Sequence, residues 1–182
     1  MRIILTGTKG SGKSTVGKRL GPILGRAVVE TDDLAERIYE RENGHPSTCR
    51  DICRELGEPA FRELEKRAVF EALEPDGDAI ICTGGQTLVD DDCRAALAEA
   101  GMLIFLKVRF DVVWGRITAG DWPSYFPESD HENWYRKRYD RFNALVEPVA
   151  DVILDVSGLN INQTVERVLE AVRESDSGTN GT

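Results

Sequence analysis

One segment near the start of the chain has the residue types and spacing of a phosphate-binding loop. Residues Gly7–Ser14 (GTKGSGKS) fit the pattern G-x-x-x-x-G-K-[ST], between an apolar run and a segment with helical spacing. Its glycines allow backbone N–H groups to point inward at a helix N-terminus, where an anion is favoured. We expect Lys13 to reach the β- and γ-phosphates of a nucleotide and the Ser14 hydroxyl to ligate Mg²⁺. The predicted nucleotide site comprises Gly7, Lys9, Gly10, Ser11, Gly12, Lys13, Ser14 and Thr15.

Other features of the sequence exclude several classes of nucleotide-binding protein. The only D-x-x-G pattern runs from Asp155 to Gly158, after the last predicted strand, and no N-K-x-D pattern occurs, which argues against a GTPase. A chain of 182 residues leaves little room for motor or transporter machinery. A small phosphotransferase remains, and a glycine-rich turn without any ligand is the alternative.

Polar residues and glycines follow two predicted strands at their carboxyl ends, where open α/β sheets bind ligands. Asp32, after the strand Ala27–Glu30, could accept a hydrogen bond from an acceptor hydroxyl or hold a Mg²⁺-bound water. The alternative is that Thr31 or Asp32 caps a helix. Gly84 and Gly85 follow the third strand and permit close approach of backbone to ligand, although a bare turn would also explain them.

Two groups of basic side chains could bind an anionic acceptor. Arg62 precedes Glu65 by three residues on a predicted helix. The two form either a solvated ion pair or a guanidinium fork held for a carboxylate or phosphate. The other group is the densest basic cluster of the chain, for which a solvated helix face is the alternative. It comprises Arg136, Lys137, Arg138 and Arg141, of which the last two have the i, i+3 spacing of an anion clamp.

Strand-like and helix-like segments alternate, which predicts an α/β protein with a parallel sheet covered on both faces. Apolar runs predict strands at Arg2–Thr6, Ala27–Glu30, Ala79–Cys82, Met102–Val108 and Val149–Val156. Helical spacing predicts helices at Ser14–Leu24, Thr31–Arg41, about 58–73, Asp90–Ala100, Asp111–Thr118 and His131–Val146, and a last one from Ile161 to Val172. Gly101 is expected to end its helix in the C′ position.

We expect one domain over residues 1–174. Residues 119–130 combine glycine, proline and aromatic residues, and we predict an irregular lid there that closes over the site. Residues 175–182 contain nothing apolar and are predicted to form a disordered tail.

Composition bounds the class of protein. Apolar residues make up 41%, enough for a core, and 32 acidic against 23 basic residues give a net charge of −9, which disfavours nucleic-acid binding. No apolar run approaches the ~20 residues of a membrane span. The four cysteines lack the density of a disulfide scaffold, and His45, Cys49 and Cys53 are too few ligands for a metal site. We therefore expect a reduced, cytoplasmic monomer with neither a nucleic-acid nor a membrane partner.

Taken together, these segments resemble the shikimate kinase family. The matching elements are the loop Gly7–Ser14, Glu30-Thr31-Asp32 for the family's D-[ST]-D, the run G-E-x-x-F-R-x-x-E at Gly57–Glu65, Thr83-Gly84-Gly85, and Arg141 through Ala150-Asp151. The resemblance covers about residues 1–173. The run at Gly57–Glu65 is the most specific of these, because many families share the phosphate loop.

The resemblance implies a three-layer P-loop kinase fold, nucleoside-monophosphate-kinase-like, with five parallel strands in the order 2-3-1-4-5. It implies ATP- and Mg²⁺-dependent phosphorylation of a hydroxyl on shikimate or a related polyhydroxy carboxylic acid. Lys13, Asp32 and Arg62 would be the catalytic residues, with Ser14 and Asp32 at the metal. Asp32 would address the acceptor hydroxyl and Arg62 and Arg141 its carboxylate. The resemblance also implies that the backbone of Gly84 and Gly85 contacts the acceptor. Arg116 would lie near the adenine.

The chain departs from the family pattern at several positions. The lid carries Trp122 where the family has an arginine, Gln86 replaces the third glycine of G-G-G, and Glu30 replaces the first acid of D-[ST]-D. The segment from Arg141 to Asp151 is one residue longer. Two alternatives therefore stay open: a P-loop kinase for another small acceptor, such as a sugar acid or nucleoside, and a weakly catalytic nucleotide-binding sensor.

Overall fold

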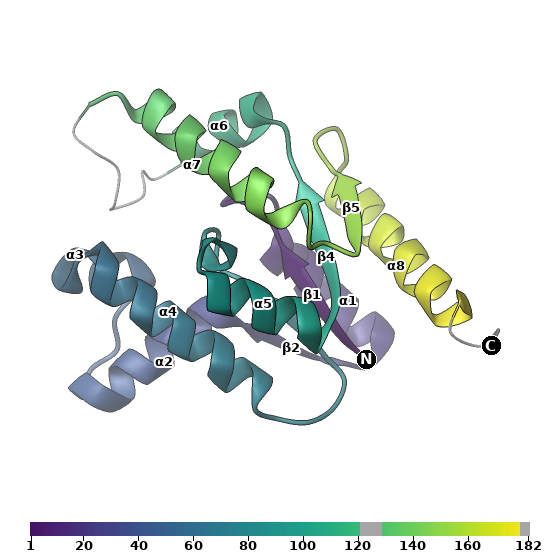
Figure 1. Cartoon of the computed structure of the whole chain (residues 1–182), viewed down its shortest axis with the longest axis horizontal. Helices are drawn as coiled ribbons and strands as arrows, with labels where there is room; N and C mark the ends of the chain where they lie inside the picture. Colours follow the sequence, from purple (N-terminus) through teal and green to yellow (C-terminus); the bar gives the residue numbers. More distant parts are fainter. Residues whose placement is uncertain (121–128, 179–182) are drawn as a thin grey trace.

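The fold is built on one parallel sheet. A computed structural model describes residues 1–120 and 129–178. The five strands are β1 (Arg2–Thr6), β2 (Ala27–Glu30), β3 (Ala79–Cys82), β4 (Gly101–Lys107) and β5 (Val152–Asp155). They lie in the order β2-β3-β1-β4-β5, which confirms the order that the resemblance implied (Figure 1).

Helices follow each strand and cover both faces of the sheet. They are α1 (Lys13–Leu24), α2 (Thr31–Asn43), α3 (Cys49–Leu56), α4 (Glu58–Leu73), the short 3₁₀ helix η1 (Thr87–Val89), α5 (Asp91–Ala100), α6 (Phe110–Thr118), α7 (His131–Val146) and α8 (Ile161–Gly178). Helices α1 and α8 pack together on one face, while α4, α5 and α7 cover the other (Figure 1). In the part of the chain that the structure describes, no helix is long and apolar enough to span a membrane.

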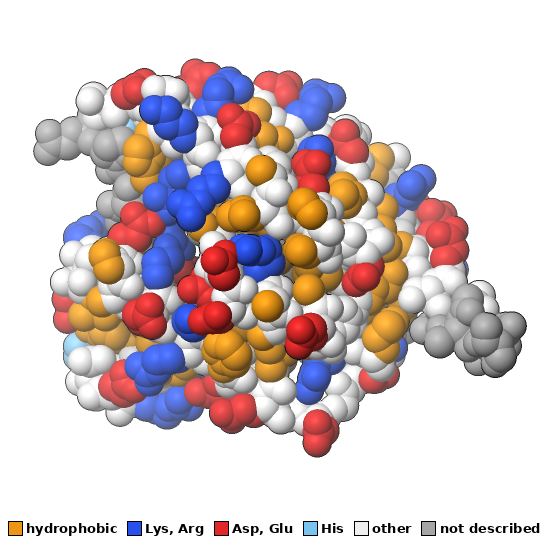
Figure 2. All heavy atoms as spheres, in the orientation of Figure 1, with side chains coloured by type: hydrophobic (Ala, Val, Ile, Leu, Met, Phe, Trp, Pro, Cys, Tyr) orange, Lys and Arg blue, Asp and Glu red, His pale blue; other side chains and the backbone are white. Residues whose placement is uncertain are grey.

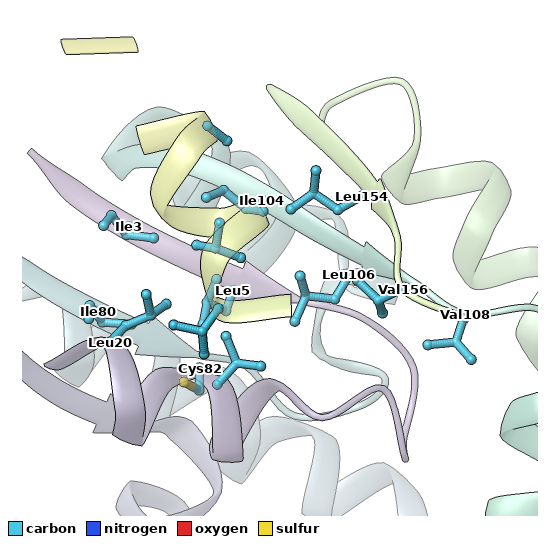
Figure 3. Packing of buried hydrophobic residues seen from close by; sticks show 14 of the residues in the cluster. Ile3, Leu5, Leu20, Ile80, Cys82, Ile104, Leu106, Val108, Leu154 and Val156 are labelled. Carbon is cyan, nitrogen blue, oxygen red and sulfur yellow. The ribbon is translucent and has the colours of Figure 1, made fainter. Parts of the chain in front are cut away.

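Alternate residues of the strands divide the core between these two faces. Ile3 and Leu5 of β1 belong to the cluster against α1 and α8 (Figure 3). Ile4 between them packs toward α4, α5 and α7. Successive strand side chains point to opposite faces, and a parallel sheet buries both, so the strands are continuously apolar. A third cluster joins α2, α3 and α4 beside the sheet.

Several boundaries differ from the sequence predictions by one to three residues, and two of them have a clear physical reason. Gly101 is the C-cap residue of α5, but its backbone is extended (φ 173°) rather than left-handed, and it is also the first residue of β4. Glycine is needed there because a Cβ would lie 2.4 Å from the Arg2 carbonyl oxygen of β1. The fifth strand starts at Val152 rather than Val149, after a turn in which the Asp151 N–H bonds the Leu103 carbonyl.

Two predicted irregular segments have different outcomes. The tail was expected from residue 175, but α8 continues through Gly178, so that expectation is wrong for residues 175–178. Residues 179–182 lie outside the described residues, as does most of the predicted lid, residues 121–128 with Trp122.

Helix α3 was not predicted at all, since only Ile52 and Cys53 of its eight residues are buried.

Candidate active site

The phosphate loop connects β1 to α1. Positive φ angles at Gly10 (83°) and Gly12 (95°) turn the chain into the first turn of α1. The ammonium of Lys13 folds back and donates to the carbonyls of Gly7 (2.8 Å) and Thr8 (3.2 Å). Burial lowers the pKa of Lys13, and nearby Asp32 opposes that shift. An anionic ligand in the cradle would offer this lysine stronger acceptors than neutral carbonyls.

The hydroxyl of Ser14, predicted as a metal ligand, donates to Glu30 Oε2 at 2.9 Å. Glu30 ends β2 and is buried, and burial raises its pKa. Its other oxygen, Oε1, has no hydrogen-bond partner among the described residues. Glu30 thus belongs to the site, although sequence reasoning noted it only as a departure from the family pattern.

Asp32 lies in the first turn of α2 and faces the phosphate loop. It does not cap the helix, since the N-cap is Glu30 and makes no side-chain capping bond. Thr31 also lies inside the helix and accepts a hydrogen bond from the Gly84 N–H at 3.0 Å. Asp32 borders the cavity and is solvent-accessible. Partial desolvation by the surrounding protein raises the pKa of its carboxyl, while the Lys13 charge opposes the rise. The capping alternative is therefore wrong.

The turn after β3 brings the acceptor side against the phosphate loop. A Cβ on Gly84 would lie 2.7 Å from Asp32 Oδ1 and 2.9 Å from Glu65 Oε1. A Cβ on Gly85 would lie 2.8 Å from the Lys9 backbone nitrogen. Both positions therefore require glycine because other groups approach the backbone so closely.

Arg62 belongs to a network of charges that joins α4 to α7. Its guanidinium pairs with Glu65 and donates to Glu58 at 2.9 Å, and Glu58 also pairs with Arg138. Burial raises the pKa of Glu65 to about 7, while the Arg62 charge opposes the rise. The ion pair predicted between Arg62 and Glu65 is confirmed, and Glu58 places a second arginine, Arg138, next to Arg62.

These residues enclose a cavity of about 370 Å³. Of the residues predicted from the sequence, its wall includes Lys9, Gly10, Gly12, Lys13, Ser14, Thr15, Asp32, Arg62 and Gly85. Gly84 lies directly beside Asp32. Gly7 and Ser11 also belong to the phosphate loop, but they are buried and do not line the cavity. Nucleotide-side and acceptor-side residues therefore share one cavity.

Arg141, predicted to bind the acceptor together with Arg62, lines a second cavity next to the first. This neighbouring cavity has a volume of about 410 Å³, lies between α4, η1, α5 and α7, and shares Arg62, Glu65 and Gln86 with the first. Arg141 has no ion-pair partner in the described ranges. Basic side chains, with acidic ones between them, gather on this face where α7 lies beside α4 (Figure 2).

Two other predicted cations sit at the edges of the site. Arg116 of α6 donates to the Gly10 carbonyl at 2.8 Å, so it contacts the outer side of the phosphate loop. Arg136 stacks over Phe110 (3.6 Å from guanidinium carbon to ring centre) and pairs with Glu132, away from the cavity. The solvated-face interpretation therefore holds for Arg136.

Comparison with known proteins agrees with this geometry. The family model for shikimate kinase matches residues 9–173. The chain belongs to the shikimate kinase family. It is 32% identical to a shikimate kinase of Corynebacterium jeikeium, over 95% of this chain and 89% of that protein.

Solved structures of the family have the same fold. A shikimate kinase from Bacteroides thetaiotaomicron superposes with a TM-score of 0.79 at 25% identity, covering 95% of this chain and 98% of that one. One from Acinetobacter baumannii, in complex with shikimate, gives 0.82 at 23% identity, covering 96% and 93%. Sequence reasoning thus found the family but missed Glu30, the Glu58–Arg138 pair and helix α3 within the site.

Proposed function

We propose that this chain transfers a phosphoryl group from ATP to a hydroxyl of shikimate or a closely related polyhydroxy carboxylic acid. The observation that carries the proposal is one cavity lined by Lys13 and Ser14 of the phosphate loop and by Asp32 and Arg62 of the acceptor side. Membership of the shikimate kinase family supports the same substrates.

Lys13 and the loop backbone supply the positive field for the phosphates. On nucleotide binding Lys13 exchanges the carbonyls of Gly7 and Thr8 for phosphate oxygens. Because its pKa is lowered by burial, an adjacent phosphate also favours its charged form. Arg116, on the outer side of the loop, is placed to meet the nucleoside part.

The residues at Ser14 fit a Mg²⁺ ion. Among the described residues no three His, Cys, Asp or Glu side chains cluster as a metal site, but Mg²⁺ in kinases takes one or two carboxylates together with substrate phosphates. Ser14, Glu30 with its unpartnered buried oxygen, and Asp32 would hold the ion directly or through water. When bound, it would neutralise charge developing on the phosphates.

Asp32 is the group that addresses the acceptor hydroxyl. It lines the same cavity as Lys13, and desolvation raises the pKa of its carboxyl, which would strengthen it as a proton acceptor. Gly84 and Gly85 leave the acceptor room beside it.

The acceptor carboxylate is assigned to Arg62 and Arg138. Both donate to Glu58 and therefore lie side by side, and paired guanidinium groups bind carboxylates well. Arg141 was predicted in this role, and Arg62, Arg138 and Arg141 all line the neighbouring cavity. We assign the second position to Arg138 because it shares Glu58 with Arg62. Cytoplasmic location, a monomeric state and the lack of nucleic-acid and membrane partners stay predictions.

The test is a turnover screen of the purified chain with ATP and Mg²⁺ against shikimate, quinate, gluconate and nucleosides. We expect shikimate to give the highest kcat/KM. A neutral nucleoside as best substrate would show that the two-arginine assignment is wrong. ATP binding without acceptor-dependent turnover of any compound would instead favour a nucleotide sensor.

A further inference from the structure

The side chain of Gln86 lies at the boundary between two cavities. The cavity of about 370 Å³ and the neighbouring one of about 410 Å³ share three wall residues, Arg62, Glu65 and Gln86. Arg62 and Glu65 come from α4 and pair with each other, whereas Gln86 comes from the turn that follows β3. Because the family pattern has glycine at this position, Gln86 adds an amide that the pattern lacks to the acceptor side.

The turn that carries Gln86 is packed between α4 and the phosphate loop. A Cβ on Gly84 would lie 2.9 Å from Glu65 Oε1, and a Cβ on Gly85 would lie 2.8 Å from the Lys9 backbone nitrogen. Groups that approach this closely on both sides prevent the turn from shifting without a clash. The backbone of Gln86 is therefore held beside the charged pair of α4.

One end of the Gln86 amide is bonded within the turn and the other end is not. Its Nε2 donates to the Gly85 carbonyl at 3.0 Å. Because a carbonyl oxygen can only accept, this bond orients the amide and leaves Oε1 for a ligand. In the described ranges Oε1 accepts no hydrogen bond, and the residue is half-buried at the cavity wall. The wall thus offers one free hydrogen-bond acceptor next to Arg62.

The chemistry of an amide indicates what this acceptor recognises. Arg62 supplies positive charge for the acceptor carboxylate, whereas Gln86 is neutral and adds no attraction for an anion. An amide oxygen binds a hydrogen-bond donor, and the donors of a polyhydroxy carboxylic acid are its hydroxyl groups. Gln86 can therefore distinguish acids of equal charge by the position of a hydroxyl.

We propose that Gln86 Oε1 accepts a hydrogen bond from a hydroxyl on the carbon that bears the acceptor carboxylate, so that the site recognises α-hydroxy carboxylic acids. A carboxylate held by Arg62 places that carbon at the wall that Arg62 and Gln86 share. Quinate has a hydroxyl on this carbon and shikimate has none. The inference rests on the proposed function, in its assignment of the carboxylate to Arg62.

Binding of quinate and shikimate to wild type and to Gln86→Met tests the proposal. Methionine keeps the length of the side chain and removes the amide oxygen. Calorimetric titration with Mg²⁺ and an ATP analogue that is not hydrolysed measures both dissociation constants. We expect the ratio of the Kd for quinate to the Kd for shikimate to rise about three- to tenfold in Gln86→Met, as for loss of one neutral hydrogen bond. A ratio within twofold of wild type in the folded variant would overturn the proposal.

Gln86→Glu separates recognition of the hydroxyl from attraction of the carboxylate. Glutamate keeps an acceptor oxygen but adds a negative charge, so both acids should bind more weakly while the ratio of their Kd values stays near that of wild type. A ratio that rises as in Gln86→Met would show that Oε1 is not the recognising atom. Val89→Ala is the matched control, because Val89 lines the neighbouring cavity but not the first, and it should leave the ratio unchanged.

Turnover of the same two acids with ATP distinguishes this inference from the proposed function. Binding that changes as expected in Gln86→Met, without phosphate transfer to either acid, contradicts the proposed function alone. Turnover of both acids with an unchanged ratio of kcat/KM in Gln86→Met contradicts the role of Gln86 alone. A wild-type protein that binds neither acid overturns both.

Discussion

The hydroxyl of Ser14 donates to the carboxylate of Glu30 across 2.9 Å and so ties the start of α1 to the end of β2. The bond occupies one oxygen of Glu30, and the other is buried with no hydrogen-bond partner among residues 1–120 and 129–178. A buried carboxylate oxygen without a donor is costly unless a cation or water completes it. This unsatisfied oxygen supports the proposal that Ser14 and Glu30 would hold Mg²⁺ at the phosphate loop.

Glu30→Gln should weaken the dependence on Mg²⁺. The amide keeps the size of the side chain but removes the negative charge, so we expect the Mg²⁺ concentration for half-maximal activity to rise by about tenfold or more. Titration of activity with Mg²⁺ at saturating ATP measures it. Asp33→Asn, on the exposed neighbour, is the control and should change little. Identical Mg²⁺ curves for Glu30→Gln and wild type would remove Glu30 from the site.

Arg62→Ala should impair use of the acceptor and spare ATP. Loss of the guanidinium removes a charge-assisted contact and leaves Glu65 buried without its partner, so acceptor kcat/KM should fall by the equivalent of about 2–4 kcal/mol. Arg67→Ala, on the same helix and paired with exposed Glu42, should behave as wild type. A rise in KM for ATP equal to the loss with the acceptor would contradict the assignment.

Glu65 should make the folded protein less stable as pH rises. Burial raises the pKa of its carboxyl from 4.5 to about 7, so between these values the folded state holds a proton that the unfolded state has lost. The free energy of unfolding therefore falls as pH increases through this window. Denaturant titrations at pH 5 and pH 8 should show the fall in wild type and a smaller one in Glu65→Gln. Glu63→Gln is the control, because Glu63 lies two residues before Glu65 and is exposed. Equal dependence of the free energy of unfolding on pH in all three proteins would show that Glu65 does not titrate between pH 5 and pH 8.

Gly84→Ala should remove activity while Gly115→Ala should not. The methyl group at position 84 would come within 2.9 Å of Asp32 Oδ1, Thr87 Oγ1 and Glu65 Oε1, which displaces the catalytic carboxylate. At Gly115, inside α6, a methyl group meets nothing within 4 Å and should stabilise the helix by about 0.5–1 kcal/mol. Both variants are compared with wild type by their turnover rate and by the midpoint temperature of thermal unfolding. Full activity in Gly84→Ala would mean that Asp32 can move without loss of function.

Features that depend on neighbouring residues were predictable from the sequence. The phosphate loop is a contiguous pattern in a strand-to-helix turn, and Asp32 follows a strand at the edge where ligands bind. The strands are recognisable because both of their faces are buried. Helix α3 was missed because its apolar content is low, and its cysteines were considered only as metal ligands.

Features that depend on distant residues were not predictable. The Glu58–Arg138 pair joins positions 80 residues apart, and no spacing in the sequence indicates it. Arg138 and Arg141 are equivalent by sequence and line the same cavity as Arg62. Only the folded structure shows that Arg138 pairs with Glu58, which also binds Arg62, whereas Arg141 does not. The strand order came from the family resemblance, since alternation alone allows several orders.

The central position of β1 has a consequence for the order in which the molecule assembles. β1 precedes the other strands in the chain, yet its partners on either side are β3 and β4. Such non-local pairing slows folding, because long loops must close before any contact is gained. As the chain emerges from the ribosome, β1 therefore has no strand to pair with until Cys82 has been made, and its second edge stays open until Lys107 follows. The phosphate loop directly follows β1. A nascent chain that ends before β3 should therefore lack an ordered phosphate loop and should not retain nucleotide.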